Sequence, residues 1–147
     1  MVQGDLKSGP GFGRLGLSLA QIAAFLEVAP GLEDFSAPWE SKVLAVTTDS
    51  RAGCPGDLFI ALKGEHFDGH DFVSSALKAG VLAAVVNKDS PAASLDGPLI
   101  RVSDTLEALG QLALAVRRLV KPKLAAVTGS VGKTTVKEIL KSIFTCS

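Results

Sequence analysis

The segment 99–135, LIRVSDTLEALGQLALAVRRLVKPKLAAVTGSVGKTT, decides the fold. It begins with a run of strand length, Leu99–Val102, followed by a capped helical pattern over Asp104–Leu119. A second apolar run, Leu124–Thr128, is predicted as a strand, and it leads through a loop into a final helix over Lys133–Phe144. Strands that alternate with helices in this way are typical of an α/β architecture.

The same alternation extends upstream. Ser18 is placed to cap a helix whose apolar residues recur at helical spacing. The segment Lys88–Pro98 is rich in Ala, Ser, Asp, Gly and Pro and is predicted as a loop near a domain edge. The upstream elements predicted are a helix from Ser18, strands Lys42–Thr48 and Asp57–Lys63, a helix Asp71–Gly80 and a strand Val81–Asn87. The buried stripe predicted for the Asp104 helix is Leu106, Leu109, Leu112, Ala113, Val116 and Leu119.

A phosphate-binding loop is predicted between the last strand and the last helix. Glycines let the backbone approach phosphate oxygens, and the start of a helix favours negative charge. Lys133 supplies a charge for the β and γ phosphates, and the Thr134 hydroxyl can ligate Mg²⁺. The full signature has a first glycine where Val127 stands, so the loop has a short form; an ordinary strand-to-helix turn is the alternative. The residues assigned to it are Thr128, Gly129, Ser130, Val131, Gly132, Lys133, Thr134 and Thr135.

Two polar turns follow the first two predicted strands. In the first turn, Thr48–Asp49–Ser50–Arg51, the hydroxyls can hydrogen-bond a base or sugar and the guanidinium can pair with a phosphate. The alternative is an ordinary turn in which the Asp49 and Ser50 side chains hydrogen-bond to their own backbone. The second turn, 63–71, has two glycines and two histidines. His66 and His70 could suggest a metal site, but the glycines argue against a helix there, and a loop with solvated histidines is expected instead. We expect Cys54, Phe59 and Trp39 to be structural.

The composition excludes several classes of protein. Fifteen basic and fifteen acidic residues balance, so no net charge recruits nucleic acid or an anionic membrane. No stretch approaches the ~20 apolar residues of a membrane span. Met1–Gly16 is polar and Gly-rich and is expected to be a flexible leader rather than a signal peptide. Cys54 and Cys146 match no metal or disulfide spacing, as expected of thiols in a reducing cytoplasm.

The blocks together resemble a known family. Thr48–Arg51, Pro55–Gly64 and Phe67–Phe72 are similar to the N-terminal domain of the Mur ligases. Thr128–Thr135, followed by Lys137–Glu138, is similar to their ATP-binding loop, which commonly has the short form. The likeness covers nearly all the chain from Leu17 onward, and the order and separation of the blocks also fit.

The resemblance implies a function in the cytoplasmic synthesis of peptidoglycan precursors. The loop is most similar to that of members that add D-alanyl-D-alanine to UDP-N-acetylmuramoyl-tripeptide; members that add the third amino acid more often have Asn where Val131 stands. ATP, with Mg²⁺, would phosphorylate the terminal carboxylate, and an amine would attack the acyl phosphate. Lys133 would be catalytic and Thr134 a metal ligand. The residues implied to hold the UDP-linked substrate are Thr48, Asp49, Ser50, Arg51, Glu65, His66 and Phe67.

Family members have three domains, which gives an expected division of this chain. Residues 17–101 would bind the UDP substrate, and 102–147 would begin the central P-loop ATPase domain. The remaining ATPase sheet and metal ligands would lie outside the chain, so we expect a monomeric, inactive N-terminal fragment. A stand-alone UDP-sugar-binding module and a P-loop phosphotransferase of another class are the alternatives.

Overall fold

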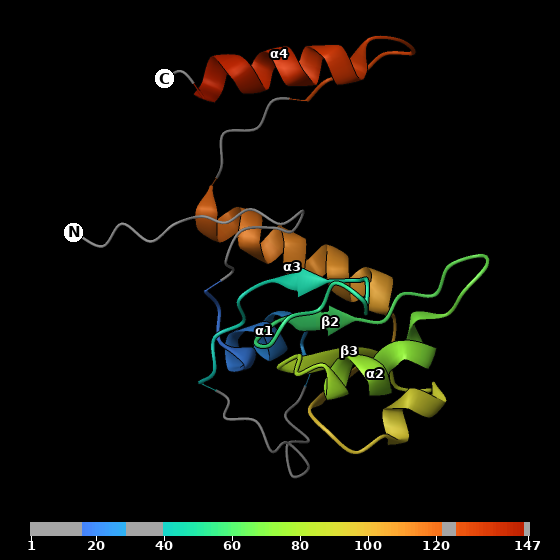
Figure 1. Cartoon of the computed structure of the whole chain (residues 1–147). Helices are drawn as coiled ribbons and strands as arrows, with labels where there is room; N and C mark the ends of the chain where they lie inside the picture. Colours follow the sequence, from blue (N-terminus) through green and yellow to red (C-terminus); the bar gives the residue numbers. More distant parts are fainter. Residues whose placement is uncertain (1–15, 29–39, 122–125, 146–147) are drawn as a thin grey trace.

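The structure is a computed structural model that describes residues 16–28, 40–121 and 126–145 of the 147. Its centre is a four-stranded parallel sheet in the order β1-β2-β3-β4, which is also the order of the strands along the chain (Figure 1). The predicted α/β architecture is therefore confirmed, and the strands pair in parallel. The strands are β1 (Val46–Thr47), β2 (Leu58–Ile60), β3 (Ala83–Asn87) and β4 (Leu99–Val102).

Helices cover both faces of this sheet (Figure 1). Side chains that alternate along each strand point to opposite faces, as the pleat requires. In β2, Leu58 and Ile60 join the core under α1 (Leu19–Phe25) and α3 (Thr105–Val120), whereas Phe59 joins the core under α2 (Val73–Lys78). The strands are apolar on both faces because both faces are buried.

The helix starts predicted from the sequence are confirmed at two positions. Ser18 caps α1 by accepting from the Gln21 amide, and the Gln21 side chain returns a bond to the Ser18 amide, which completes a capping box. Asp104 caps α3 by accepting from the amides of Leu106 and Glu107. Each cap satisfies helix amides that have no partner within the helix.

The first predicted strand is shorter than its pattern. Lys42–Thr48 contributes only β1, because the backbone of Val43 pairs with the segment before α1 instead. The Val43 amide donates to the Leu17 carbonyl at 2.9 Å, and an antiparallel bridge joins Ser18 to Lys42. Val43 is therefore buried in the core although it is not part of a strand of the sheet.

The buried face of α3 differs from the predicted stripe. Thr105, Ala108 and Leu112 are buried, whereas Leu106 is 68% exposed and Leu119 is also exposed. Ala113 is exposed as well. Leu112 is buried as predicted, and Leu109 and Val116 pack against the core as predicted. Apolar residues occur around most of this helix, so their spacing alone did not fix which side faces the sheet.

Two other segments also differ from expectation. Residues 126–128, the described part of the predicted strand Leu124–Thr128, are not a strand; a strand needs a paired neighbour, and the described sheet gives them none. Lys88–Pro98, predicted as a loop near a domain edge, connects the neighbouring strands β3 and β4 of one sheet. It contains a short 3-10 helix, η2 (Pro91–Ser94), whose Ala92 and Ala93 are buried.

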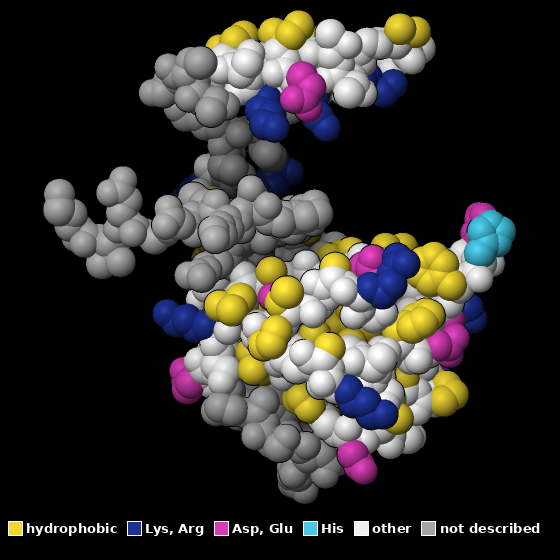
Figure 2. All heavy atoms as spheres, in the orientation of Figure 1, with side chains coloured by type: hydrophobic (Ala, Val, Ile, Leu, Met, Phe, Trp, Pro, Cys, Tyr) yellow, Lys and Arg dark blue, Asp and Glu magenta, His cyan; other side chains and the backbone are white. Residues whose placement is uncertain are grey.

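The remaining helices are η1 (Gly69–Phe72), which leads directly into α2, and α4 (Lys133–Thr145). The final helix is confirmed close to its predicted bounds. It lies apart from the sheet in Figure 1, and Figure 2 shows apolar side chains along one side of it and charged ones along the other. Trp39, Cys146 and the predicted leader, apart from Gly16, lie outside the described residues.

Candidate functional site

The two polar turns predicted from the sequence lie at the same edge of the sheet. All four strands are parallel, so their carboxyl ends meet at one edge. Thr48–Arg51 follows β1, and Glu65–Phe67 follows β2, which pairs with β1 through Val46 and Leu58. Ligands of parallel α/β sheets bind at this edge. The structure therefore brings the turns after β1 and β2 to the position where such a sheet binds small molecules.

The turn after β1 is organised by Asp49. Its Oδ1 accepts from both the amide and the side-chain Nε of Arg51 at 3.0 Å, and its Oδ2 accepts from Arg51 Nη2 at 3.1 Å. The side-chain hydrogen bonding between Asp49 and Arg51 is the main reason that the pKa of Asp49 is lowered and the pKa of Arg51 is raised. The Arg51 side chain remains 88% exposed, so its outer face is open to a further anion.

The second turn is a short projection closed at its base. An antiparallel bridge joins Lys63 to Asp68, and the Gly64 amide donates to the Phe67 carbonyl at 2.9 Å. Between these residues, Glu65 and His66 are exposed and Phe67 is 65% exposed. The turn therefore presents an acidic, an imidazole and an aromatic side chain to solvent at the carboxyl edge.

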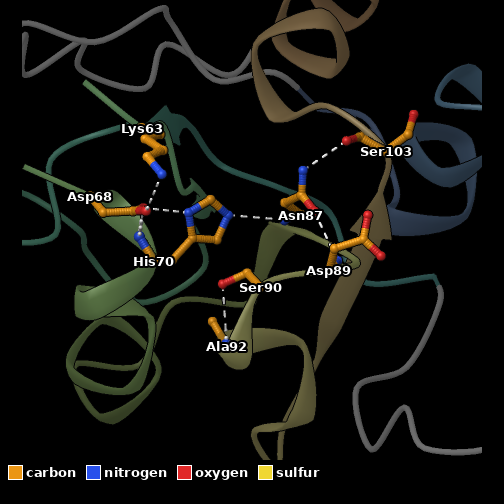
Figure 3. Close-up of polar contacts among 8 residues, drawn as sticks. All are labelled: Lys63, Asp68, His70, Asn87, Asp89, Ser90, Ala92 and Ser103. Atoms are coloured by element: carbon orange, nitrogen blue, oxygen red, sulfur yellow. Dashed lines mark hydrogen bonds and ion pairs between the residues drawn. The ribbon is translucent and has the colours of Figure 1, made fainter. Parts of the chain in front are cut away.

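Below this turn, His70 is buried, which corrects the expectation of two solvated histidines. Its Nδ1 lies 2.5 Å from Asp68 Oδ1, and its Nε2 lies 3.0 Å from the Asn87 amide nitrogen (Figure 3). A backbone amide can only donate, so Nε2 accepts and Nδ1 carries the proton. The same Asp68 oxygen accepts from the His70 amide at 2.9 Å, and this bond is the main cause that lowers the pKa of Asp68.

Asn87 links three connections at the carboxyl edge. Its backbone amide donates to the Nε2 atom of His70, which follows β2. Its side-chain Oδ1 accepts from the Asp89 amide at 2.8 Å, and its side-chain Nδ2 donates to the Ser103 carbonyl at 2.7 Å. Neither Asp68 nor Asn87 was predicted as a site residue. The available signal was Asp68 two residues before His70, a spacing at which an aspartate accepts from a backbone amide.

The predicted phosphate loop leads into α4 at Lys133, but the described residues before it do not form the expected strand. Gly129 and Gly132 have φ values of +142° and +81°, a region that favours glycine. Lys133 Nζ folds back and donates to the Gly129 carbonyl. The side chain of Val131 is 90% exposed, and the first turn of α4 begins at Lys133 with Thr134 and Thr135 beside it. The amides of such a first turn have no partner within the helix and are available to an anion.

The structure does not bring the phosphate loop and the two turns side by side. The loop and α4 stand apart from the sheet in Figure 1, and residues 122–125, which connect them to α3, lie outside the described part of the chain. Among the described residues, no group of three or more His, Cys, Asp or Glu could hold a metal ion. None of the described helices has the length and apolar character that crossing a membrane requires.

Comparison with known proteins identifies the family. A family model described as "Mur ligase family, catalytic domain" matches residues 42–117, which include both turns and the whole sheet. This chain belongs to the Mur ligase family. The match removes the alternative of a P-loop phosphotransferase of another class, and it does not extend to the phosphate loop.

Individual members of the Mur ligase family are also similar to this chain. The chain is 48% identical over 99 residues to the UDP-N-acetylmuramoyl-tripeptide--D-alanyl-D-alanine ligase of Escherichia coli strain K12, a match of 67% of this chain and 21% of the relative. The UDP-N-acetylmuramoylalanyl-D-glutamyl-2,6-diaminopimelate--D-alanyl-D-alanyl ligase structure from Acinetobacter baumannii superposes with a TM-score of 0.68 at 32% identity, over 95% of this chain and 29% of that one.

A third similar protein was solved with a nucleotide. It is the MurF ligase of Thermotoga maritima in complex with ADP, with a TM-score of 0.50 and 36% identity over 65% of this chain and 22% of that one. The chain spans about a fifth of the length of the curated relatives that it matches.

Proposed function

We propose that this chain is the N-terminal, substrate-holding part of an ATP-dependent ligase that joins D-alanyl-D-alanine to UDP-N-acetylmuramoyl-tripeptide. The observation that carries the proposal is the meeting of the turns after β1 and β2 at one carboxyl edge, within the region matched by the family model. The names of the similar ligases favour D-alanyl-D-alanine over a third amino acid as the group added.

The two turns would bind different parts of the UDP-linked substrate. Arg51 is exposed and offers guanidinium donors to a phosphate, while Asp49 fixes its orientation. Ser50 and Thr48 would bond the base or sugar. In the second turn, Glu65 and His66, with Phe67 beside them, would contact the nucleotide sugar, because their side chains are exposed at the same edge.

The phosphate loop would bind ATP. The positive φ values of Gly129 and Gly132, the Lys133 amine and the amides at the start of α4 fit a chain of phosphates. Bound ATP would supply the phosphoryl group that activates the substrate carboxylate. Thr134 is the one protein ligand that we assign to Mg²⁺, and further ligands would come from phosphate oxygens and from parts of the ligase outside this chain.

We propose that the chain contains parts of two domains that bind different ligands. Residues 17–101 would hold the UDP substrate and 102–147 would begin the ATP-binding domain, with α3 as the connecting helix, since Ala108 and Leu112 pack on the first sheet. The apolar side of α4 would pack against the rest of the ATP-binding domain. The whole ligase would act as a cytoplasmic monomer.

The test is calorimetry of this chain with UDP-N-acetylmuramoyl-tripeptide. We expect measurable binding, and about a tenfold weaker Kd in Arg51→Ala, because a charge-assisted bond to phosphate is lost. Ser50→Ala should also weaken binding. Arg118→Ala, which removes another exposed arginine at the far end of α3, is the matched control and should leave the Kd unchanged.

A second measurement concerns the phosphate loop. We expect no ATP hydrolysis by this chain alone, since the groups that complete a phosphoryl-transfer site must converge on it from elsewhere. Unchanged affinity in both Ser50→Ala and Arg51→Ala would discard the assignment of the first turn. ATP turnover by the chain would refute its description as a substrate-holding part.

A further inference from the structure

The buried His70 lies directly beneath the exposed turn of residues 64–67, and packing alone does not explain why a polar ring is buried there. An imidazole costs free energy to bury unless both ring nitrogens are bonded. Here both are, one by Asp68 and one by the Asn87 amide (Figure 3). An apolar side chain would fill the same volume without that requirement. The polar contacts therefore fix the position of a segment as well as filling space.

Those contacts join two parts of the chain that the sheet alone does not connect. Asp68 closes the base of the turn through its bridge with Lys63, and it holds both the amide and the ring of His70. The ring then reaches across to the last residue of β3. The turn is thus tied to the end of the neighbouring strand by a path of two side-chain bonds.

The tie is rigid at each end. The Gly69 amide donates to the Leu62 carbonyl at 2.8 Å, and a Cβ at Gly69 would lie 2.7 Å from that oxygen, so the backbone at Gly69 packs tightly against the segment that directly follows β2. Asn87 is held in turn by bonds to Asp89 and to the Ser103 carbonyl, which follows β4. These bonds hold both partners of the His70 ring in place, and through Asp68 they hold the base of the turn.

We propose that His70 is a positioning residue for the substrate turn: as the Nδ1–H tautomer held between Asp68 and the Asn87 amide, it fixes Glu65–Phe67 at the edge where the nucleoside diphosphate sugar binds. This inference rests on the proposed function. His70 is buried and touches no ligand itself; its contribution is that the exposed side chains of the turn are ordered before the ligand arrives, which removes the cost of ordering them on binding.

The structure offers a matched pair of variants. Asp68 and Ser90 each cap a short 3-10 helix, Asp68 by accepting from the His70 amide at 2.9 Å and Ser90 from the Ala92 amide at 3.2 Å. Only Asp68 also holds an imidazole. Asp68→Ala and Ser90→Ala therefore remove similar caps, and the difference between them reports the bond to the ring together with the 4.0 Å ion pair between Asp68 and Lys63. Asp68→Asn separates these two contributions, because it loses the charge that pairs with Lys63. Asp68→Asn keeps the accepting oxygen and should rescue.

The experiment combines amide hydrogen exchange at Gly64 and Gly69 with the Kd for UDP-N-acetylmuramoyl-tripeptide. In Asp68→Ala we expect about tenfold faster exchange at Gly64 and about a tenfold weaker Kd, whereas Ser90→Ala and Asp68→Asn should differ from the unaltered chain by less than about twofold. Nitrogen shifts of the His70 ring should show a protonated Nδ1 and an accepting Nε2 in the unaltered chain.

Other results would overturn the inference. If Asp68→Ala does not fold, His70→Phe, which keeps a ring in the buried site and loses both bonds, provides the same comparison with Ser90→Ala. Unchanged exchange at Gly64 would show that the ring does not hold the turn. Faster exchange with an unchanged Kd would show that holding the turn is irrelevant to the ligand. Failure of the unaltered chain to bind would instead refute the proposed function, while the exchange comparison would still decide whether His70 holds the turn.

Discussion

Gly69→Ala should destabilise this protein strongly, because the position has no room for a methyl group. The added Cβ would lie 2.7 Å from the Leu62 carbonyl oxygen and 2.8 Å from the Leu62 nitrogen. Both are backbone atoms of the segment that directly follows β2, and neither can rotate away. Overpacking of this kind costs about 1–3 kcal/mol. Weakening the 2.8 Å bond from the Gly69 amide to Leu62 adds about 1 kcal/mol.

The free energy of unfolding should therefore fall by about 2–4 kcal/mol. For a unit of this size the melting temperature changes by about 4–8 °C per kcal/mol, so we expect Tm to fall by about 8 °C or more. Thermal unfolding followed by circular dichroism, with urea unfolding alongside, measures both quantities.

Gly110→Ala is the control with the opposite expected sign. Gly110 lies within α3, and a Cβ there would meet no atom within 4 Å. Because alanine restricts the unfolded chain and favours a helix, this variant should gain about 0.5–1 kcal/mol. Equal melting temperatures of Gly69→Ala and the unaltered chain would refute the close approach of this backbone to β2, and with it the placement of the turn above His70.

Two further predictions concern the packing of α3 and the charge of Asp68. Leu112→Ala should cost about 2–5 kcal/mol, whereas Leu114→Ala, two residues away and 46% exposed, should cost well under half of that; similar costs would show that α3 does not pack on the sheet. The pKa of Asp68 is lowered from 3.8 by its bond from the His70 amide, so its stabilising contribution is complete above the unfolded pKa and is lost as the pH falls through the folded pKa. The stability difference between the unaltered chain and Asp68→Asn should therefore shrink in acid, and a difference that grew below pH 3.8 would contradict the assignment.

The fold was predictable where local signals agree. β4 has the predicted bounds, and α3 begins after its predicted cap, because a strand of apolar residues followed by Asp104 leaves few alternatives. Val43 shows where such signals fail. Its burial comes from pairing with the distant segment before α1, which no short-range pattern encodes.

The site was predictable in part, for a different reason. Exposed polar turns after successive strands are visible in the sequence, and the parallel sheet then places them at one edge. The support beneath them was not predicted, because the burial of His70 depends on Asn87, which is 17 residues away. No local pattern connects these two residues; the pairing of β2 with β3 brings them together.

The order of the sheet has a consequence for synthesis on the ribosome. Each strand pairs with the one made just before it, so the sheet can grow as the chain emerges. The core on one face is different, since Leu19 and Ile22 from the start of the unit pack with Ala108 and Leu112 from its end. Until α3 has left the exit tunnel, only α1 covers that apolar face, and the nascent chain at this stage exposes apolar surface to aggregation or to chaperones.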